Sequence, residues 1–262
     1  MSSPAAAFPP APETGDCSLE GAAPATVAAV DEDFELLLDD GRRATLSGLE
    51  FPSKAGEGSA FREAAHRRLS EWLAGRDIFV GAFAAAPDRW GRVSARAFAA
   101  SGEGKDAPLV SVAAALLSAG EARFRPEPAA APCAKDYLAA EAAAREAGRG
   151  LWSQPMFREI DPGAPGARED LLRRKGMVIV AGAIRSVGET SRAVYLNFGQ
   201  KRRDDFSVVI SRRNLTMFAG IELRSLIGRR ARVRGLVETG FGPRIEIATP
   251  AEIEFFEGGA SP

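Results

Sequence analysis

Two strand-rich stretches, separated by a segment without periodicity, constrain the fold of this 262-residue chain more than any other feature. From Thr26 onward, short apolar runs alternate with turn signals such as D-D-G at 39–41, and a second group of alternating runs begins near residue 176. The intervening residues mix Pro, Gly and charge, which is typical of a linker. The sequence therefore predicts a disordered Pro/Ala-rich leader at 1–25, a domain at 26–153, a linker at 154–175 and a second domain at 176–257.

The order of the expected elements indicates a mainly β fold with α-helices. The first stretch predicts three strands, a helix, two strands and two further helices. Its first helix is indicated by Phe61, Ala65, Leu69 and Leu73, which recur on one face before Gly75 ends the pattern. The second stretch predicts five strands with one short helix between the third and fourth, an order typical of an OB-type β-barrel but shared by other five-stranded units.

The formal net charge of -1 hides an asymmetry between the two stretches. Residues 171–257 carry 16 Lys and Arg against 9 Asp and Glu, which leaves 18 against 26 in the remainder. A basic module that meets polyanions would produce this split, and so would two ordinary solvated surfaces. Charge alone does not distinguish between these two explanations.

Several classes of protein are disfavoured by the residues present. The chain has no run of apolar residues long enough for a transmembrane helix, so we expect no membrane partner. The single histidine, His66, and the two cysteines lack the company of other metal-ligating residues, and we expect His66 on a solvated helix face. The opening residues do not read as a signal peptide, and whether one precedes them stays open.

Four motifs in residues 26–153 together resemble the thermonuclease family of staphylococcal-nuclease-type proteins. They are the turn D-E-D-F at 31–34, the strand ending L-S-G-L-E-F-P at 46–52, the turn D-R-W-G-R at 88–92 and the helix end G-R-G-L-W at 148–152. The resemblance implies an SNase-like OB barrel with three helices, which the second small OB-type barrel would follow.

The family resemblance also implies a calcium site. In that family a calcium ion held by acidic residues binds the scissile phosphate, two arginines stabilise its developing charge, and a glutamate orients the attacking water. The calcium carboxylates fall on Asp33 and Glu50, with Asp31 beside them, and the third protein ligand is the backbone carbonyl of Phe51. The alternative is that these acids form turns without metal.

The remaining catalytic positions are substituted. The catalytic glutamate of the family falls on Ser53 and its first arginine on Thr45, whereas the second arginine is retained as Arg92. A general base contributes roughly 100- to 10,000-fold and a charge-stabilising donor roughly 100- to 1,000-fold, so the resemblance implies weak or absent hydrolysis. Arg43 and Glu57 are possible substitutes. Arg92 is alternatively structural, held in its turn by Asp88 and packed against Trp90.

The second domain offers a candidate surface for single-stranded DNA or RNA. Arg230, Arg232 and Arg234 alternate along one expected strand, which places them on one face, and Tyr195 is the best outward-facing aromatic. A structural or protein-contacting barrel with solvated arginines is the alternative.

The two cysteines flank the family-like domain at its entry and at its final helix. Pairing of Cys17 with Cys133 resembles the exported members of the family and would place the protein in the periplasm or outside the cell. The alternative is a free thiol at a helix N-terminus. The leading functional hypothesis is a nuclease-like nucleic-acid-binding protein with a degenerate site. Active calcium-dependent hydrolysis and a non-catalytic protein-binding scaffold are the alternatives.

Overall fold

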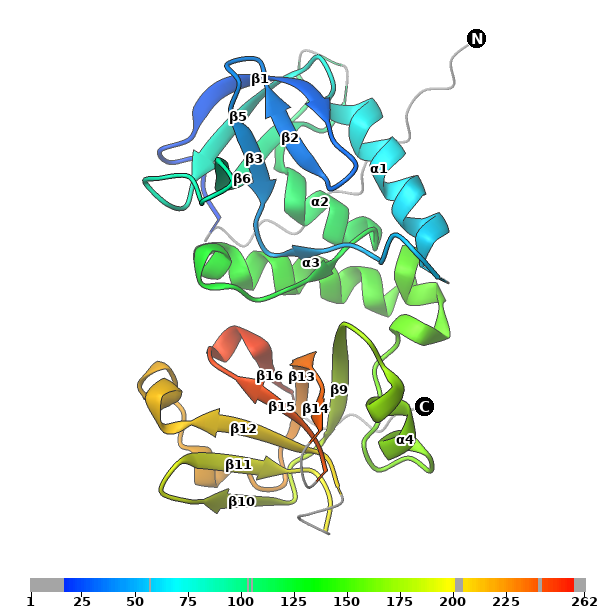
Figure 1. The fold of residues 1–262 in the computed structure, drawn as a ribbon, viewed down its shortest axis with the longest axis vertical. Coiled ribbons are helices and arrows are strands. Elements are labelled where there is room, and N and C mark those ends of the chain that lie inside the picture. The colour runs from blue at the N-terminus through cyan, green and yellow to red at the C-terminus, as the bar shows by residue number, and fades with distance from the viewer. Residues whose placement is uncertain are drawn as a thin grey trace. The chain divides into compact units, whose positions relative to one another are not determined.

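The computed structural model describes residues 17–56, 58–102, 104, 106–200, 205–239 and 242–256. The chain divides between Gln154 and Pro155 into two compact units, which run from blue to green and from green to red in Figure 1. Within the described residues, no helix combines the length and the apolar character needed to span a bilayer.

The first unit is built on a closed β-barrel. Its strands are β1 (Ala23–Val30), β2 (Glu35–Leu38), β3 (Arg43–Leu46), β4 (Leu49–Glu50), β5 (Asp77–Ala82), β6 (Arg92–Ala100), β7 (Leu109–Ser111) and β8 (Arg123–Phe124). The main sheet has the order β3-β2-β1-β5-β6-β7, and an additional parallel pairing of β3 with β6 closes five of these strands into a barrel. The prediction of a barrel in this part of the chain is confirmed.

Three α-helices accompany the barrel: α1 (Ser59–Leu73), α2 (Val112–Ala119) and α3 (Ala134–Glu146). Helix α1 buries Leu69 and Leu73, as its apolar spacing predicts. Helix α2 begins after Ser111, whose hydroxyl accepts a hydrogen bond from the backbone N–H of Ala114. It ends at Gly120, where φ is 71° and the backbone lies against Arg149, so only glycine fits without strain.

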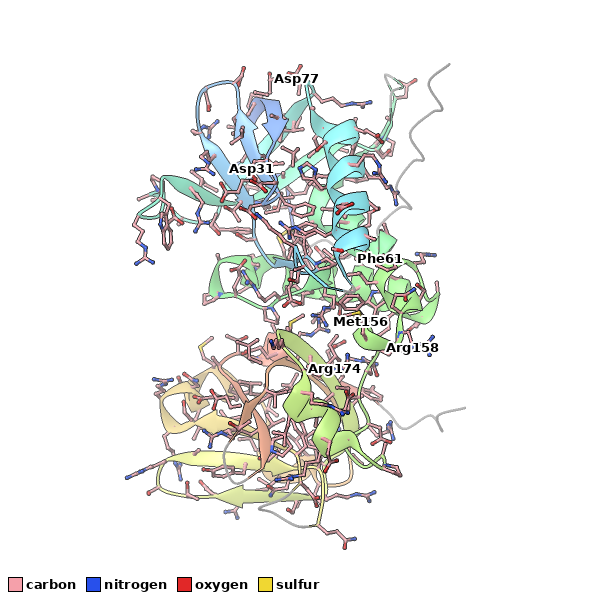
Figure 2. The ribbon with its side chains drawn as sticks, turned by 45° about the vertical axis from the view of Figure 1, so that its right-hand side comes forward. Asp31, Phe61, Asp77, Met156, Arg158 and Arg174 are labelled. Carbon is pink, nitrogen blue, oxygen red and sulfur yellow. A yellow bond between two sulfur atoms is a disulfide. The ribbon has the colours of Figure 1, made fainter. Side chains whose placement is uncertain are left out.

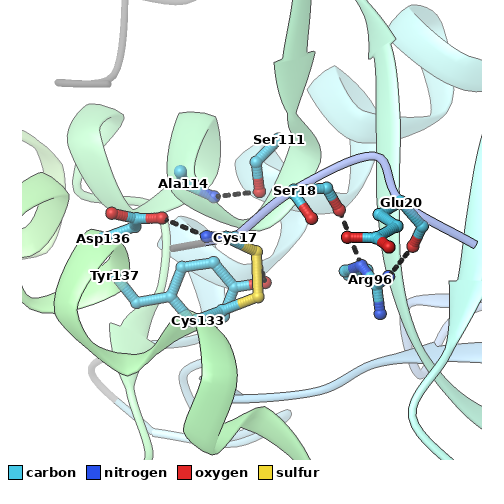
Figure 3. The surroundings of a disulfide bond; sticks show 9 residues. All are labelled: Cys17, Ser18, Glu20, Arg96, Ser111, Ala114, Cys133, Asp136 and Tyr137. Carbon is cyan, nitrogen blue, oxygen red and sulfur yellow. Dashed lines mark hydrogen bonds between the residues drawn. A yellow bond between two sulfur atoms is a disulfide. The ribbon is translucent and has the colours of Figure 1, made fainter. Parts of the chain in front are cut away.

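A disulfide joins Cys17 to Cys133, as the family resemblance implied. The Cα atoms of the two cysteines lie 4.5 Å apart, well within the range that a disulfide bridges. Figure 3 shows further attachments of the same segment: Asp136 Oδ2 accepts from the Cys17 N–H at 2.7 Å, and Arg96 donates to the carbonyl of Ser18 at 2.9 Å. The chain after Cys17 is thereby fixed to the first unit. Of the expected leader, residues 1–16 lie outside the described residues, and β1 already begins at Ala23.

The second unit consists of two sheets around one core. Its strands are β9 (Met177–Ala183), β10 (Ser186–Glu189), β11 (Ala193–Asn197), β12 (Ser207–Ser211), β13 (Arg230–Leu236), β14 (Glu238–Thr239), β15 (Pro243–Ile247) and β16 (Ile253–Phe256). They pair as β10-β11-β12-β15-β14 and as β16-β13-β9, with β12 and β15 parallel. A parallel pair therefore occurs in both units. Because the described strands form two separate sheets, a closed second barrel stays a prediction.

The segment that was expected to be a linker belongs structurally to the second unit, and that expectation is wrong. It contains helix α4 (Ala167–Arg173), and both Ile160 and Leu171 are buried in the core of the second unit. Ile160 also forms a parallel bridge with Val180 of β9. Arg174 donates to the carbonyl of Met156, and both residues are labelled in Figure 2. The apolar residues of this segment are spaced without a regular period, so their burial leaves no periodic signal in the sequence.

Candidate functional site

Strand register in the barrel brings together residues that lie far apart in the sequence. Thr45 of β3 pairs with Glu35 of β2, and Arg43 of β3 pairs with Arg92 of β6. Arg43 and Thr45 are two residues apart on one strand and therefore share a face. Three residues therefore lie around Glu35: Thr45 at the substituted arginine position, its possible substitute Arg43, and the retained Arg92.

Glu35 binds both arginines. Its Oε2 lies 2.6 Å from Arg43 Nη2, and its Oε1 accepts from Arg92 Nη1 at 3.2 Å. The side chain of Glu35 is only 6% exposed, whereas those of Arg43 and Arg92 are 45% and 34% exposed. Glu35 is absent from the candidates predicted from sequence. The available signal was an acidic residue opening an otherwise apolar strand, E-L-L-L at 35–38.

Arg92 is also fixed within its own turn. Asp88 Oδ2 accepts from Arg92 Nε at 2.8 Å, and Asp88 Oδ1 accepts from the backbone N–H groups of Trp90 and Arg92 at 2.9 Å each. These hydrogen bonds, led by the backbone N–H of Arg92, lower the pKa of Asp88, and the Asp88 carboxylate raises the pKa of Arg92. The contacts expected of a structural turn are therefore present.

The turn presents an exposed aromatic ring between two cations. Trp90 is 57% exposed. The guanidinium carbon of Arg89 lies 3.8 Å from the centre of the Trp90 ring, and that of Arg92 lies 4.7 Å from it. Such cation–π contacts hold an aromatic ring in place.

The acidic residues of the expected calcium site are each held by cations. Asp33 Oδ1 lies 2.8 Å from Lys54 Nζ and 3.2 Å from Arg62 Nη2, and the hydrogen bond from Lys54 is the main cause that lowers the pKa of Asp33. Glu50 Oε2 lies 2.5 Å from Arg123 Nη2.

Asp31, which Figure 2 labels beside the barrel, has a different role in the same turn. Its Oδ1 accepts from the backbone N–H groups of Asp33 and Glu35 at 2.9 Å each, and its Oδ2 accepts from Arg43 at 3.3 Å. These contacts shape the turn between β1 and β2, as the alternative without metal requires.

In this arrangement the two expected calcium carboxylates are paired with cations of the protein, Asp33 with Lys54 and Arg62 and Glu50 with Arg123. Calcium takes six to eight oxygen ligands, usually from several converging carboxylates. Among the residues that the structure describes, no three His, Cys, Asp or Glu side chains gather as a metal-binding group. Phe51, whose backbone carbonyl was the third expected ligand, stacks its ring on Phe34 at 3.5 Å between centroids. Phe34 itself has φ of 65°, an unusual value for a residue other than glycine.

Ser53 lies in the loop between β4 and α1. Ser53 Oγ accepts from the backbone N–H of Ala55 at 3.3 Å, and the possible substitute Glu57 lies outside the described residues. His66 corrects an expectation, because it is half-buried rather than solvated. Its ring meets Phe34 edge-on at 5.5 Å, and its Nε2 lies 2.9 Å from the carbonyl oxygen of Asp31. A pocket of about 290 Å³ lies beside it, lined by Glu32, Lys54, Ser59, Arg62, Glu63 and His66.

The expected arginine face of the second unit is largely engaged in ion pairs. Arg232 Nε lies 2.5 Å from Glu159, and Arg234 Nη2 lies 2.7 Å from Glu254 Oε1. Arg234 is also fully buried. The expectation of a solvent-facing row is therefore wrong for Arg234, because strand alternation fixes the face of a side chain and not what covers that face.

The other two residues of that expected surface are half-buried. Arg230 lies with its guanidinium carbon 5.6 Å from the ring of Phe256. Tyr195 lies on β11, opposite Gly188 of the neighbouring strand. Neither residue forms a stacking platform comparable with Trp90.

The fold of the first unit, a five-stranded barrel with three helices, defines an SNase/OB-like class of domain. Residues 43–154 match the family model described as Staphylococcal nuclease homologue. The chain is similar to this family over these residues, which include Thr45, Ser53 and Arg92. The family match does not extend into the second unit. Among curated proteins, a search found no match to the chain.

Proposed function

We propose that this protein is nuclease-like and binds single-stranded nucleic acid through its first unit without hydrolysing it. The observation that carries the proposal is that each charged group described at the family's catalytic and metal positions binds another side chain of that unit. Asp33 is held by Lys54 and Arg62, Glu50 by Arg123, and Arg92 by Asp88 and Glu35.

The chemistry of the substituted positions supports the absence of hydrolysis. Ser53 carries a hydroxyl where a base would orient water, and a hydroxyl is not a base at neutral pH. Thr45 supplies no positive charge, and its hydroxyl is buried without a hydrogen-bond partner. Of the family's two catalytic arginines and its catalytic glutamate, the site therefore retains only Arg92.

Binding of single strands is supported by Trp90. Unpaired bases stack on exposed aromatic rings without sequence preference, and adjacent arginines add attraction for the phosphates. Trp90 is exposed and its ring contacts both Arg89 and Arg92. Trp72 and Trp152 are buried, so the platform depends on Trp90 alone among the tryptophans.

Fluorescence anisotropy of a labelled single-stranded oligonucleotide tests this proposal at about 50 mM salt. We expect Trp90→Ala to weaken binding by roughly 10-fold or more, because stacking of one base contributes about 1–3 kcal/mol. Met217→Ala is the matched control, since Met217 is equally exposed but lies in the second unit. Equal affinities for the unaltered protein and for Trp90→Ala would contradict the proposal.

A protein-binding scaffold is the second candidate, and it applies to the second unit. The ion pairs of Arg232 and Arg234 favour it over a polyanion surface. A hollow of about 220 Å³ on that unit is lined by apolar residues, among them Val187, Val194 and Leu215, together with Glu189, Glu222 and Arg224. If no oligonucleotide binds to the full chain at low salt, this candidate gains.

The disulfide is compatible with an extracellular protein. We propose that the chain works in an oxidising compartment such as the periplasm or the extracellular space. Survival of the Cys17–Cys133 bond in protein isolated from its native source under thiol-blocking conditions would support that location.

A further inference from the structure

Glu35 is a buried carboxylate whose two partners remain accessible to solvent. Arg43 and Arg92 approach its two oxygens from different strands, at 2.6 and 3.2 Å. The side chains of Arg43 and Arg92 are between a third and a half exposed, while that of Glu35 is almost fully buried. Two guanidiniums that converge on one anion form the arrangement by which proteins bind phosphate groups.

One outside anion would reproduce the charge that Glu35 contributes to its surroundings. Arg43 also contacts Asp31 at 3.3 Å, and Arg92 also contacts Asp88 at 2.8 Å. Two positive groups therefore face three negative ones. A phosphodiester carries one negative charge for each phosphate, as an ionised Glu35 does, so the exchange of one for the other would leave the local charge unchanged.

We propose that Glu35 is a resident anion that occupies a phosphate site formed by Arg43 and Arg92. The side chain excludes external phosphate from this site in the unaltered protein. The inference deepens the proposed function, because it names Glu35 as the residue that keeps Arg92 from a substrate phosphate. It rests on the proposed function for the absence of hydrolysis. It also predicts that loss of Glu35 opens an anion site.

The test measures binding of inorganic phosphate to the full-length, disulfide-bonded chain by isothermal titration calorimetry, with chloride at matched ionic strength as the reference. Glu35→Ala should bind phosphate at least about tenfold more tightly than the unaltered protein, since hydrogen bonds between charged partners are among the strongest that a protein forms. Adding Arg92→Ala to Glu35→Ala should remove the gain. Glu35→Gln, which removes the charge but keeps the side-chain volume, should gain less.

Glu121→Ala is the matched control. Glu121 is also a buried carboxylate of the first unit, but among the described residues it pairs with one arginine, Arg68, and burial raises its pKa to about 7. Its removal should therefore create no comparable phosphate site.

The proposal is overturned if Glu35→Ala, with native circular dichroism, binds phosphate no better than the unaltered protein or Glu121→Ala. If Glu35→Ala does not fold in chloride, Glu35→Gln decides by the same comparison. Phosphate-dependent recovery of folding in Glu35→Ala would support the site. Failure of oligonucleotide binding to respond to Trp90→Ala would contradict the proposed function and leave this phosphate result unaffected.

Discussion

Each unit contains a carboxylate that binds two arginines, and the two clusters differ in what they leave accessible. Glu35 holds Arg43 and Arg92, which come from two strands and are substantially exposed. Glu254 holds Arg232 and Arg234, which come from one strand and are mostly buried. Similar ion pairs therefore serve different ends, because a buried arginine stabilises packing whereas an accessible one can still exchange its partner for an outside anion.

A further difference between the units predicts the largest effect. The Cys17–Cys133 disulfide closes a loop with a sequence separation of 116 within the first unit, and the second unit contains no cysteine. Cys17→Ser with Cys133→Ser should lower the unfolding free energy of the first unit by about 4 to 5 kcal/mol in the chain-entropy model.

Urea unfolding followed by tryptophan fluorescence measures this loss, because all three tryptophans, Trp72, Trp90 and Trp152, belong to the first unit. Hydrogen exchange of β9 and β13 serves as the control and should not change. A loss shared equally by both units would contradict the assignment of the disulfide to the first unit alone.

The next effect separates the two arginine clusters. Glu254→Gln should destabilise the second unit by about 3 kcal/mol, because the buried Arg234 loses its ion pair with Glu254. Glu35→Gln should cost the first unit only about 1 kcal/mol, since Arg43 and Arg92 keep Asp31 and Asp88 and are partly solvated.

Hydrogen exchange detected by mass spectrometry reports both losses in one experiment, through the amides of β13 and of β3. If the Glu35 variant loses more protection than the Glu254 variant, the structural and exchangeable roles have been assigned to the wrong clusters.

Much of the first unit could be predicted from sequence. Strand alternation and helical spacing gave the element order, and the motifs from Asp31 to Trp152 gave the barrel and the cysteine pair. The sequence also indicated Arg92 and Arg43, but it did not indicate Glu35, which binds both of them. Glu35 becomes visible only through the register of β2 with β3 and of β3 with β6, which are long-range pairings.

The errors in the second unit have a related physical origin. The alternation of Arg230, Arg232 and Arg234 correctly places them on one strand, yet Glu254 on the neighbouring strand and Glu159 before β9 neutralise two of them. The apolar residues of the segment containing Ile160 and Leu171 show no regular spacing, because single side chains rather than one continuous face pack into the core. Tertiary packing decides which groups cover a residue, and local sequence patterns do not predict it.

The most direct test of the account is cleavage of single-stranded DNA and RNA by the purified, disulfide-bonded protein with and without calcium. We predict no calcium-dependent cleavage by the unaltered chain. Ser53 replaces the catalytic base, Thr45 replaces one catalytic arginine, and Glu35 binds the other catalytic arginine, Arg92. The combined change Glu35→Ala, Thr45→Arg and Ser53→Glu should raise cleavage more than any single change. Robust cleavage by the unaltered protein, abolished by a chelator and by Arg92→Ala, would contradict the account.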